Sequence, residues 1–156
     1  MFGFNNLLLN DSSYRRDFID SGMFHVEPKS YNILAAYNNA LKQRNYVIKT
    51  KNFTDIDFWN KELIKYNTKL FSHRYAYFLQ LFEEFKKIVN DLKNSLPDLY
   101  GEIGSLDIKY NKGWDSDDYE KELYNSYNKD KNIGYTSVGT HRSDILVSSN
   151  NNPVKE

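Results

Sequence analysis

The sequence predicts a mostly helical α+β fold, in which an antiparallel helical hairpin is joined by short helices and a small β-containing C-terminal segment. Two patterns in the 156 residues predict this fold. From residue 31 to residue 48, and again from residue 56 to residue 92, apolar side chains recur every three, four or seven positions, which is the spacing of one helix face. Beyond Pro97, apolar and polar residues alternate, as is typical of strands.

The first elements can be placed from their start and stop residues. The sequence of residues 1–10 is typical of a strand or of an irregular leader, and Asp11-Ser12-Ser13 is a typical helix start. We expect this first helix to be closed by Gly22. Pro28 suits the first turn of a second helix, which should run to about Thr50. The apolar stripe of that helix comprises Tyr31, Leu34, Leu41 and Ile48, with Ala35 and Ala36 between them.

A longer helix follows. Thr54, with Asp57 three residues later, favours a capped start, and Pro97 marks the end. The apolar residues repeat close to the coiled-coil period. They are Ile56, Trp59, Leu63, Tyr66, Leu70, Tyr77, Leu81, Phe85, Ile88 and Leu92.

The two helices differ in length and have a short connection. At ~1.5 Å per residue the longer helix would measure ~60 Å and its predecessor ~35 Å. Since only residues 51–53 join them, the helices must form an antiparallel hairpin with unequal arms. Leu79, Phe82 and Val89 fall beside the apolar seam, so we expect the overhanging half to be buried more widely.

The remaining elements alternate between strand and helix. Leu106, Ile108 and Tyr110 would share one strand face, and residues 111–113 would turn. Residues 115–118 should lead into a helix that ends near Asn132, and we expect strands over 133–138 and 145–148 and a turn over 150–153. The chain then divides into three segments: a leader with a short helix (1–27), the hairpin (28–97) and an α+β segment (98–156).

The composition excludes several classes of function. Lys and Arg together number 21, as do Asp and Glu, so no global charge attracts nucleic acid and any DNA contact must be a local patch. The absence of cysteine excludes disulfides and thiolate metal sites. Since no apolar run approaches the ~20 residues of a membrane helix, we expect a soluble, cytoplasmic protein without membrane contact.

Four short motifs occur in a distinctive order. They are Tyr14-Arg15-Arg16-Asp17-Phe18-Ile19-Asp20, Phe24-His25-Val26-Glu27-Pro28, Leu41-Lys42-Gln43-Arg44-Asn45 and Gly139-Thr140-His141-Arg142-Ser143-Asp144-Ile145. In this order and at these separations they resemble an internal region of the RecF family, bacterial ATPases of the ABC/SMC-like type in DNA replication and repair. The resemblance covers about residues 12–156, and more weakly 50–130.

The resemblance implies a function for the whole protein. A RecF-like protein binds ATP with magnesium, forms an ATP-dependent homodimer and binds single-stranded or gapped duplex DNA. It acts with RecO-like and RecR-like partners to load a recombinase during DNA repair, replication and the SOS response. In this comparison the hairpin is the arm lobe, and the chain is an internal piece that lacks the phosphate loop, the signature motif and the acidic metal-binding strand. We therefore expect no cofactor and no ATPase activity in this chain alone.

The resemblance also assigns a nucleotide role to His141, Arg142 and Asp144, which would lie near the ATP site. On a strand, Arg142 and Asp144 would share a face and could pair or hold a phosphate, with His141 on the opposite face. A structural Arg–Asp pair is the plainer interpretation. Thr140 stands where the family usually has proline, which leaves the local backbone geometry open.

Arg15, Arg16, Lys42 and Arg44 belong to the one basic concentration of the chain and are our candidates for DNA binding. A solvated helix surface is the default alternative for these cations. Tyr75, Tyr77 and Phe78 could stack on bases, although core packing explains their spacing better.

Two other functions stay open at this point. The main alternative is a stand-alone helical-hairpin module that binds a protein partner through the aromatic seam. A small metal-dependent enzyme would need a metal site, yet His25, His73 and His141 are scattered without ligand spacing, so we predict no metal.

Overall fold

The computed structural model describes residues 11–96, 103–149 and 152–153. The predicted leader at 1–10 and the predicted helix end at Pro97 lie outside this range. The first helix, α2 (Ser12–Val26), starts as predicted, since the Asp11 carboxylate accepts hydrogen bonds from the Ser13 and Tyr14 amides at 3.1 and 3.4 Å. The predicted end at Gly22 is wrong. A side chain at Gly22 would collide with the Tyr77 hydroxyl, so this glycine permits close packing rather than ending the helix.

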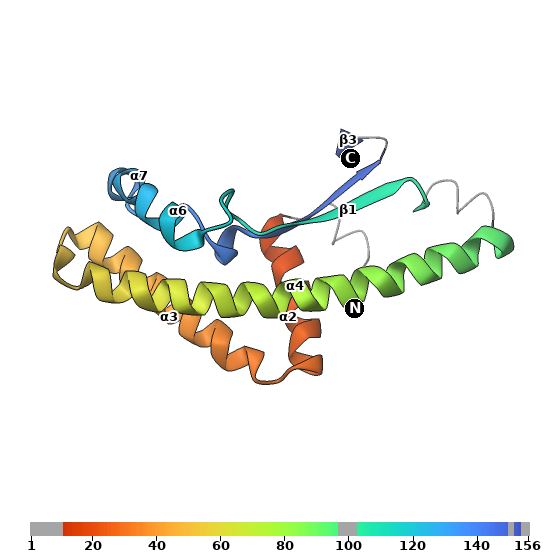
Figure 1. The fold of residues 1–156 in the computed structure, drawn as a ribbon, viewed down its shortest axis with the longest axis horizontal. Coiled ribbons are helices and arrows are strands. Elements are labelled where there is room, and N and C mark those ends of the chain that lie inside the picture. Colours follow the sequence, from red (N-terminus) through yellow and green to blue (C-terminus); the bar gives the residue numbers. More distant parts are fainter. Residues whose placement is uncertain (1–10, 97–102, 150–151, 154–156) are drawn as a thin grey trace.

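The hairpin is confirmed. Helix α3 (Ser30–Thr50) has 21 residues and α4 (Ile56–Ser95) has 40, and Figure 1 shows them side by side with the second half of α4 extending beyond its partner. The connection contains Lys51 with a positive φ of 55° and a 3-10 turn over Phe53–Asp55. Thr54 does not cap α4, because its hydroxyl donates to Asn52 within that turn.

The buried face of the hairpin is more polar than the apolar pattern predicts. In α3, Tyr31 is 63% exposed, and the buried residues are Ser30, Tyr37, Ala40, Arg44, Val47 and Ile48. In α4, Leu63 and Leu70 of the predicted seam are completely buried, but Asn60, Asn67 and Arg74 are buried between and beside them. Asn67 and Arg74 bond to a loop, residues 134–143, whose backbone requires hydrogen-bond partners, and Asn60 accepts a hydrogen bond from Arg44.

The sheet contains β1 (Leu106–Asn111), β2 (Asp144–Ser149) and β3 (Asn152–Pro153), antiparallel and in that order. Asn111 pairs with Asp144 and Leu106 with Ser149. As predicted, Leu106, Ile108 and Tyr110 share the more buried face. Tyr110 packs on Phe78 of α4, with ring centroids 5.4 Å apart. The predicted wider burial of the overhanging half is wrong for Leu79, which is 43% exposed.

The segment between β1 and β2 differs from the prediction in two ways. After residues 115–118 it contains two helices, α6 (Tyr119–Asn125) and α7 (Tyr127–Ile133), instead of the single helix predicted to end near Asn132. Residues 133–138 form no strand; the Thr136 amide donates to the Asn45 side chain of α3 at 2.8 Å. Residues 134–138, which follow α7, thus form a loop bound to the hairpin.

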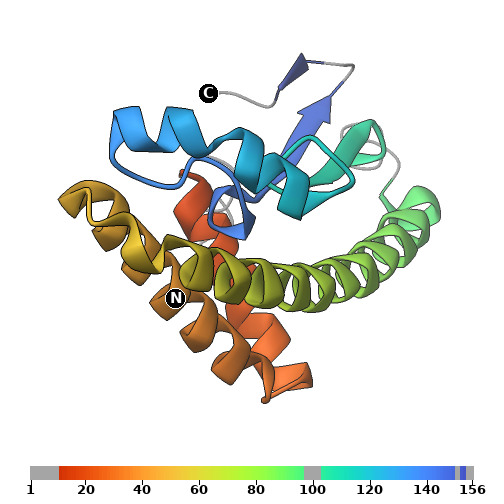
Figure 2. The same ribbon diagram turned by 60° about the vertical axis from the view of Figure 1, so that its left-hand side comes forward.

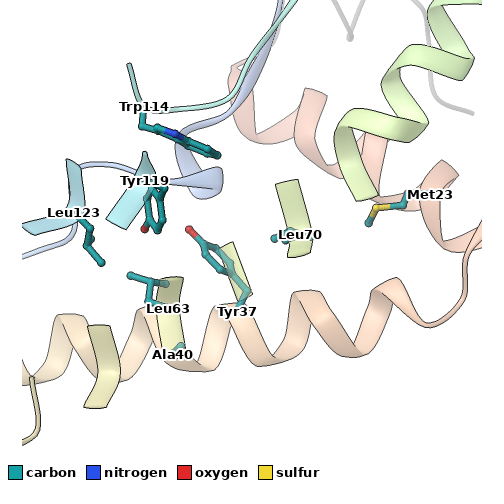
Figure 3. Packing of buried hydrophobic residues seen from close by; sticks show 8 residues of the cluster. All are labelled: Met23, Tyr37, Ala40, Leu63, Leu70, Trp114, Tyr119 and Leu123. Atoms are coloured by element: carbon teal, nitrogen blue, oxygen red, sulfur yellow. The ribbon is translucent and has the colours of Figure 1, made fainter. Parts of the chain in front are cut away.

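Figures 1 and 2 show α6 and α7 lying over the closed end of the hairpin. The hydrophobic core comprises Met23 of α2 together with Tyr37, Ala40, Leu63, Leu70, Trp114, Tyr119 and Leu123 (Figure 3). One core therefore joins α2, the hairpin and the α6 region. No helix in the described residues combines the length and the apolar character that crossing a bilayer demands.

Candidate functional site

The candidate site is the loop that carries the Gly139–Ile145 motif. Thr140–Arg142 form a 3-10 turn and Asp144 begins β2, so the prediction that His141, Arg142 and Asp144 alternate along one strand is wrong. Gly139 has a φ of 134°, and a Cβ there would lie 2.9 to 3.1 Å from polar atoms of Tyr119, Tyr37 and Asn67. The turn therefore approaches the hairpin as closely as glycine allows.

Two asparagines of the hairpin hold this loop in the same manner. The side-chain oxygen of Asn67 accepts hydrogen bonds from the amide and hydroxyl of Thr140, at 2.8 and 3.1 Å. Asn45 accepts from the amide and hydroxyl of Thr136, at 2.8 and 2.7 Å. Each asparagine oxygen takes the place that a carbonyl of a neighbouring strand would have in a sheet. The amides of Thr136 and Thr140 therefore have hydrogen-bond acceptors although the loop forms no strand.

Arg44 lies beneath the loop. Its side chain is fully buried and donates to Asn60, Asp130 and Thr136, at 2.8, 2.8 and 2.7 Å. The other carboxylate oxygen of Asp130 accepts from the amide and hydroxyl of Ser137. The prediction that Arg44 contacts DNA is therefore wrong, because its guanidinium is inside the core.

Arg74 makes a second buried pair on the other side of the turn. It donates to both oxygens of Asp20 in α2, at 2.7 and 2.8 Å, and to the Thr140 carbonyl at 2.8 Å. A bidentate arginine–carboxylate pair fixes both distance and orientation. Separating the pair would leave a buried charge without a partner, which is costly. Because Arg74 also bonds to Thr140, the pair fixes the position of α2 relative to the turn.

His141 is inside the site rather than at its surface. Its Nδ1 lies 2.8 Å from the Tyr37 hydroxyl and its Nε2 lies 3.0 Å from the Thr136 carbonyl. Because a carbonyl only accepts, we assign the proton to Nε2, so that Tyr37 donates to Nδ1. Burial lowers the pKa of His141 from 6.5 to about 4, with Arg142 and Arg16 adding to the decrease. At neutral pH the imidazole is an uncharged positioning group.

The remaining predicted residues surround the same turn. Arg15 pairs with Asp144 through bonds of 2.6 and 3.0 Å, and this hydrogen bonding raises the pKa of Arg15. Arg16 donates to the Ser143 carbonyl at 2.9 Å. Arg142 is exposed, and its guanidinium carbon lies 5.4 Å from the ring centroid of Tyr135. Thus Asp144 pairs with Arg15, not with Arg142.

Lys42, His25 and His73 stay apart from this site. Lys42 lies exposed on α3. His25, His73 and His141 do not come together, since His73 bonds to Ser30 and His141 lies in the core. In the described ranges, no three His, Asp or Glu side chains are grouped so as to hold a metal ion.

The sequence analysis missed Asn67, Arg74 and Asn45, although a signal for the first two existed. Asn60, Asn67 and Arg74 recur every seven residues, so they mark a polar row on the same helix face as the apolar seam. Polar side chains next to a buried apolar seam indicate that the helix packs against a segment whose backbone N–H and C=O groups need hydrogen-bond partners.

Comparison with known proteins agrees with the motifs. No protein-family model matches the chain. The DNA replication and repair protein RecF of Vibrio vulnificus is 29% identical over 153 residues, which are 97% of this chain, and that of Actinobacillus succinogenes is 33% identical over 154 residues. The chain spans about 40% of the length of these relatives.

The fold agrees as well. A solved structure of the recombination mediator protein RecF-ATP in the RecFOR pathway superposes with a TM-score of 0.71 at 20% identity, covering 97% of this chain and 43% of the other. A second RecF structure gives a TM-score of 0.69 at 21% identity. The chain is thus RecF-like over nearly its whole length, and the resemblance to the RecF family that its motifs predict is confirmed.

Proposed function

We propose that this chain forms the arm lobe and adjoining turn of a RecF-like recombination mediator. The proposed protein binds single-stranded or gapped DNA in an ATP-dependent way, as a homodimer in the cytoplasm. It acts with RecO-like and RecR-like proteins to load a recombinase during repair, replication and the SOS response. Support comes from the similarity to proteins named for DNA replication and repair and from the fold shared with a RecF–ATP structure.

One observation carries the mechanism: the turn is fixed to the hairpin. Asn67 and Arg74 of α4 both bond to Thr140, at 2.8 Å each, and Arg44 and Asn45 of α3 both bond to Thr136. Because these contacts are short and mostly buried, we expect the turn to move together with the part of α4 that carries Asn67 and Arg74. An event at the turn is therefore transmitted to the arm.

The residues present do not by themselves fit ATP with magnesium. A P-loop triphosphate site has a glycine-rich loop that ends in Gly-Lys-Ser/Thr, and none of the seven glycines lies in such a motif. Arg142 offers one exposed cation at the turn. We therefore assign no step of ATP hydrolysis to this chain, and ATP and magnesium belong to the proposed whole protein.

The stand-alone interaction module is less well supported. That interpretation needs an accessible apolar seam, whereas Leu63 and Leu70 are completely buried and Trp59, Tyr66 and Tyr77 pack against the chain's own core. The exposed apolar side chains of α4 are scattered, with Phe58, Leu79 and Ile88 exposed by 58%, 43% and 60%.

Fluorescence anisotropy with a labelled gapped duplex tests the proposed DNA contact. We expect weak, salt-sensitive binding, and Lys42→Ala should flatten the slope of log affinity against log salt by about one unit. The matched control is Lys87→Ala, which removes an exposed cation paired with Glu84 on the far half of α4. Absence of binding at low salt, or an equal effect of both variants, would contradict the proposal.

A further inference from the structure

The Phe24-His25-Val26-Glu27-Pro28 motif has no part in the proposed function, although the structure places it beside a cleft. This cleft, of about 300 Å³, lies between the end of α2 and the middle of α4. Figures 1 and 2 show α2 crossing α4, so that the last turn of α2 lies on the side of α4 opposite to the sheet. The cleft therefore shares no residue with the turn that carries Arg142.

The crossing of the two helices explains why the cleft exists. Gly22 marks the closest approach, because a Cβ there would collide with the hydroxyl of Tyr77. Helices that cross at an angle diverge on either side of their closest point, so α2 leaves α4 beyond Gly22. Among the lining side chains of α2, Met23 is buried and Val26 is 63% exposed. The cleft thus deepens from the motif toward the crossing.

The α4 wall of the cleft is fixed before anything binds. His73, Ala76 and Gln80 recur at three and four positions, so they line one face of α4. The ring of His73 is held because its Nδ1 lies 2.8 Å from the hydroxyl of the buried Ser30. Ala76 is small and exposed, which keeps the floor of the cleft open. A site with fixed walls loses little conformational entropy when it is occupied.

The cleft favours a cation. Glu27 is the one carboxylate among its lining residues, and no lysine or arginine in the described part of the chain lines it; Lys29, two positions after Glu27, is outside. Glu27 also ends α2, where its amide donates to the Met23 carbonyl at 2.8 Å. Because the C-terminal end of a helix carries a partial negative charge, the backbone adds to the effect of the carboxylate.

We propose that this cleft binds an arginine side chain of a protein partner. The methylenes of that arginine lie on Met23 and Ala76, its guanidinium donates to the Glu27 carboxylate, and an apolar residue beside it covers Val26. Arginine fits because its stem packs on apolar surface while its planar head donates several hydrogen bonds. A volume of about 300 Å³ suits one side chain. The inference does not rest on the proposed function.

Methyl nuclear magnetic resonance tests this proposal inside the cleft. The chain has two methionines, so labelling their methyl groups with carbon-13 gives a signal from Met23 and a reference signal from Met1. The probes are the peptide acetyl-Leu-Arg-Leu-Ala-amide and the same peptide with citrulline, which is uncharged, in place of arginine. The arginine peptide should shift the Met23 signal saturably. The citrulline peptide should bind about fivefold more weakly, as expected for the loss of one partly exposed ion pair.

Two variants with matched controls locate the binding site. Glu27→Gln should remove the difference between the peptides, whereas Glu83→Gln, on the far half of α4, should keep it. Ala76→Phe should fill the cleft and abolish the Met23 shift, whereas Ala35→Phe, at an exposed alanine of α3, should not. Because both alanines are exposed, both variants should keep the wild-type melting midpoint.

Three results would overturn the proposal: no saturable shift of Met23, equal binding of the two peptides, or a difference between them that survives Glu27→Gln. The last comparison decides even if Ala76→Phe fails to fold. A gapped duplex that shifts Met23 and displaces the arginine peptide would assign the cleft to nucleic acid instead. Because the peptide titration contains no DNA, its outcome is separate from the anisotropy test of the mediator function.

Discussion

Lowering the pH should destabilise this fold through His141. The folded chain holds this imidazole neutral, with a pKa near 4, whereas the unfolded chain protonates it near 6.5. Below pH 6.5 the unfolded state therefore binds a proton that the folded state excludes. Each pH unit then removes about 1.4 kcal/mol of stability, up to about 3 kcal/mol at pH 4.

Urea unfolding at several pH values measures this effect. Because Asp and Glu also titrate in the lower part of this range, the informative quantity is the difference between the wild type and His141→Gln. Glutamine keeps a donor for the Thr136 carbonyl without titrating. The free energy of unfolding should fall more steeply between pH 6.5 and 4 in the wild type than in the variant. Parallel curves would refute the assignment of a neutral, buried His141.

Three further predictions follow from the packing and the site. Leu63→Glu should abolish the cooperative thermal transition seen by circular dichroism, because a buried unpaired charge costs several kcal/mol. The control Lys61→Glu, on the exposed face, should keep the transition. An unchanged melting midpoint for Leu63→Glu would contradict the hairpin core. Arg74→Met should lower the free energy of unfolding by about 3–5 kcal/mol, because it leaves Asp20 buried and unpaired. Adding Asp20→Leu to this variant should recover much of the lost stability. If urea unfolding showed that the effects of the two substitutions simply add, the ion pair would be contradicted. The chain alone should not bind a fluorescent ATP analogue with micromolar affinity in magnesium, and such binding, if abolished by Arg142→Ala, would show a self-sufficient nucleotide site.

Sequence patterns predicted the parts of the fold that depend on local periodicity. The unequal hairpin and the strand face of Leu106, Ile108 and Tyr110 follow from the spacing of apolar residues. The patterns failed where a side chain in one element satisfies the backbone of another. The loop over residues 134–138 resembles a strand in its sequence, but its partner is the Asn45 side chain, 91 positions away from Thr136.

The sequence predicted which residues belong to the candidate site but not which of them form ion pairs. The motifs placed Arg15, Arg16, Arg142 and Asp144 among the functional residues, and all four lie at one turn. Which arginine meets Asp144 depends on how α2 crosses the sheet, and no spacing in the sequence encodes that crossing. Arg44 shows the same limit, because a cation on a predicted helix face is indistinguishable from one buried against a distant Asp130.

Hydrogen exchange at the Thr140 amide tests the central claim most directly, that the hairpin fixes this turn. If the bond from this amide to Asn67 persists in solution, Thr140 should exchange only upon global unfolding, as slowly as core amides of α4 near Leu70. Asn67→Ala should accelerate exchange at Thr140 much more than at Thr136, which is held by Asn45. Rapid exchange at Thr140 in the wild type, typical of a solvent-exposed loop, would contradict the account.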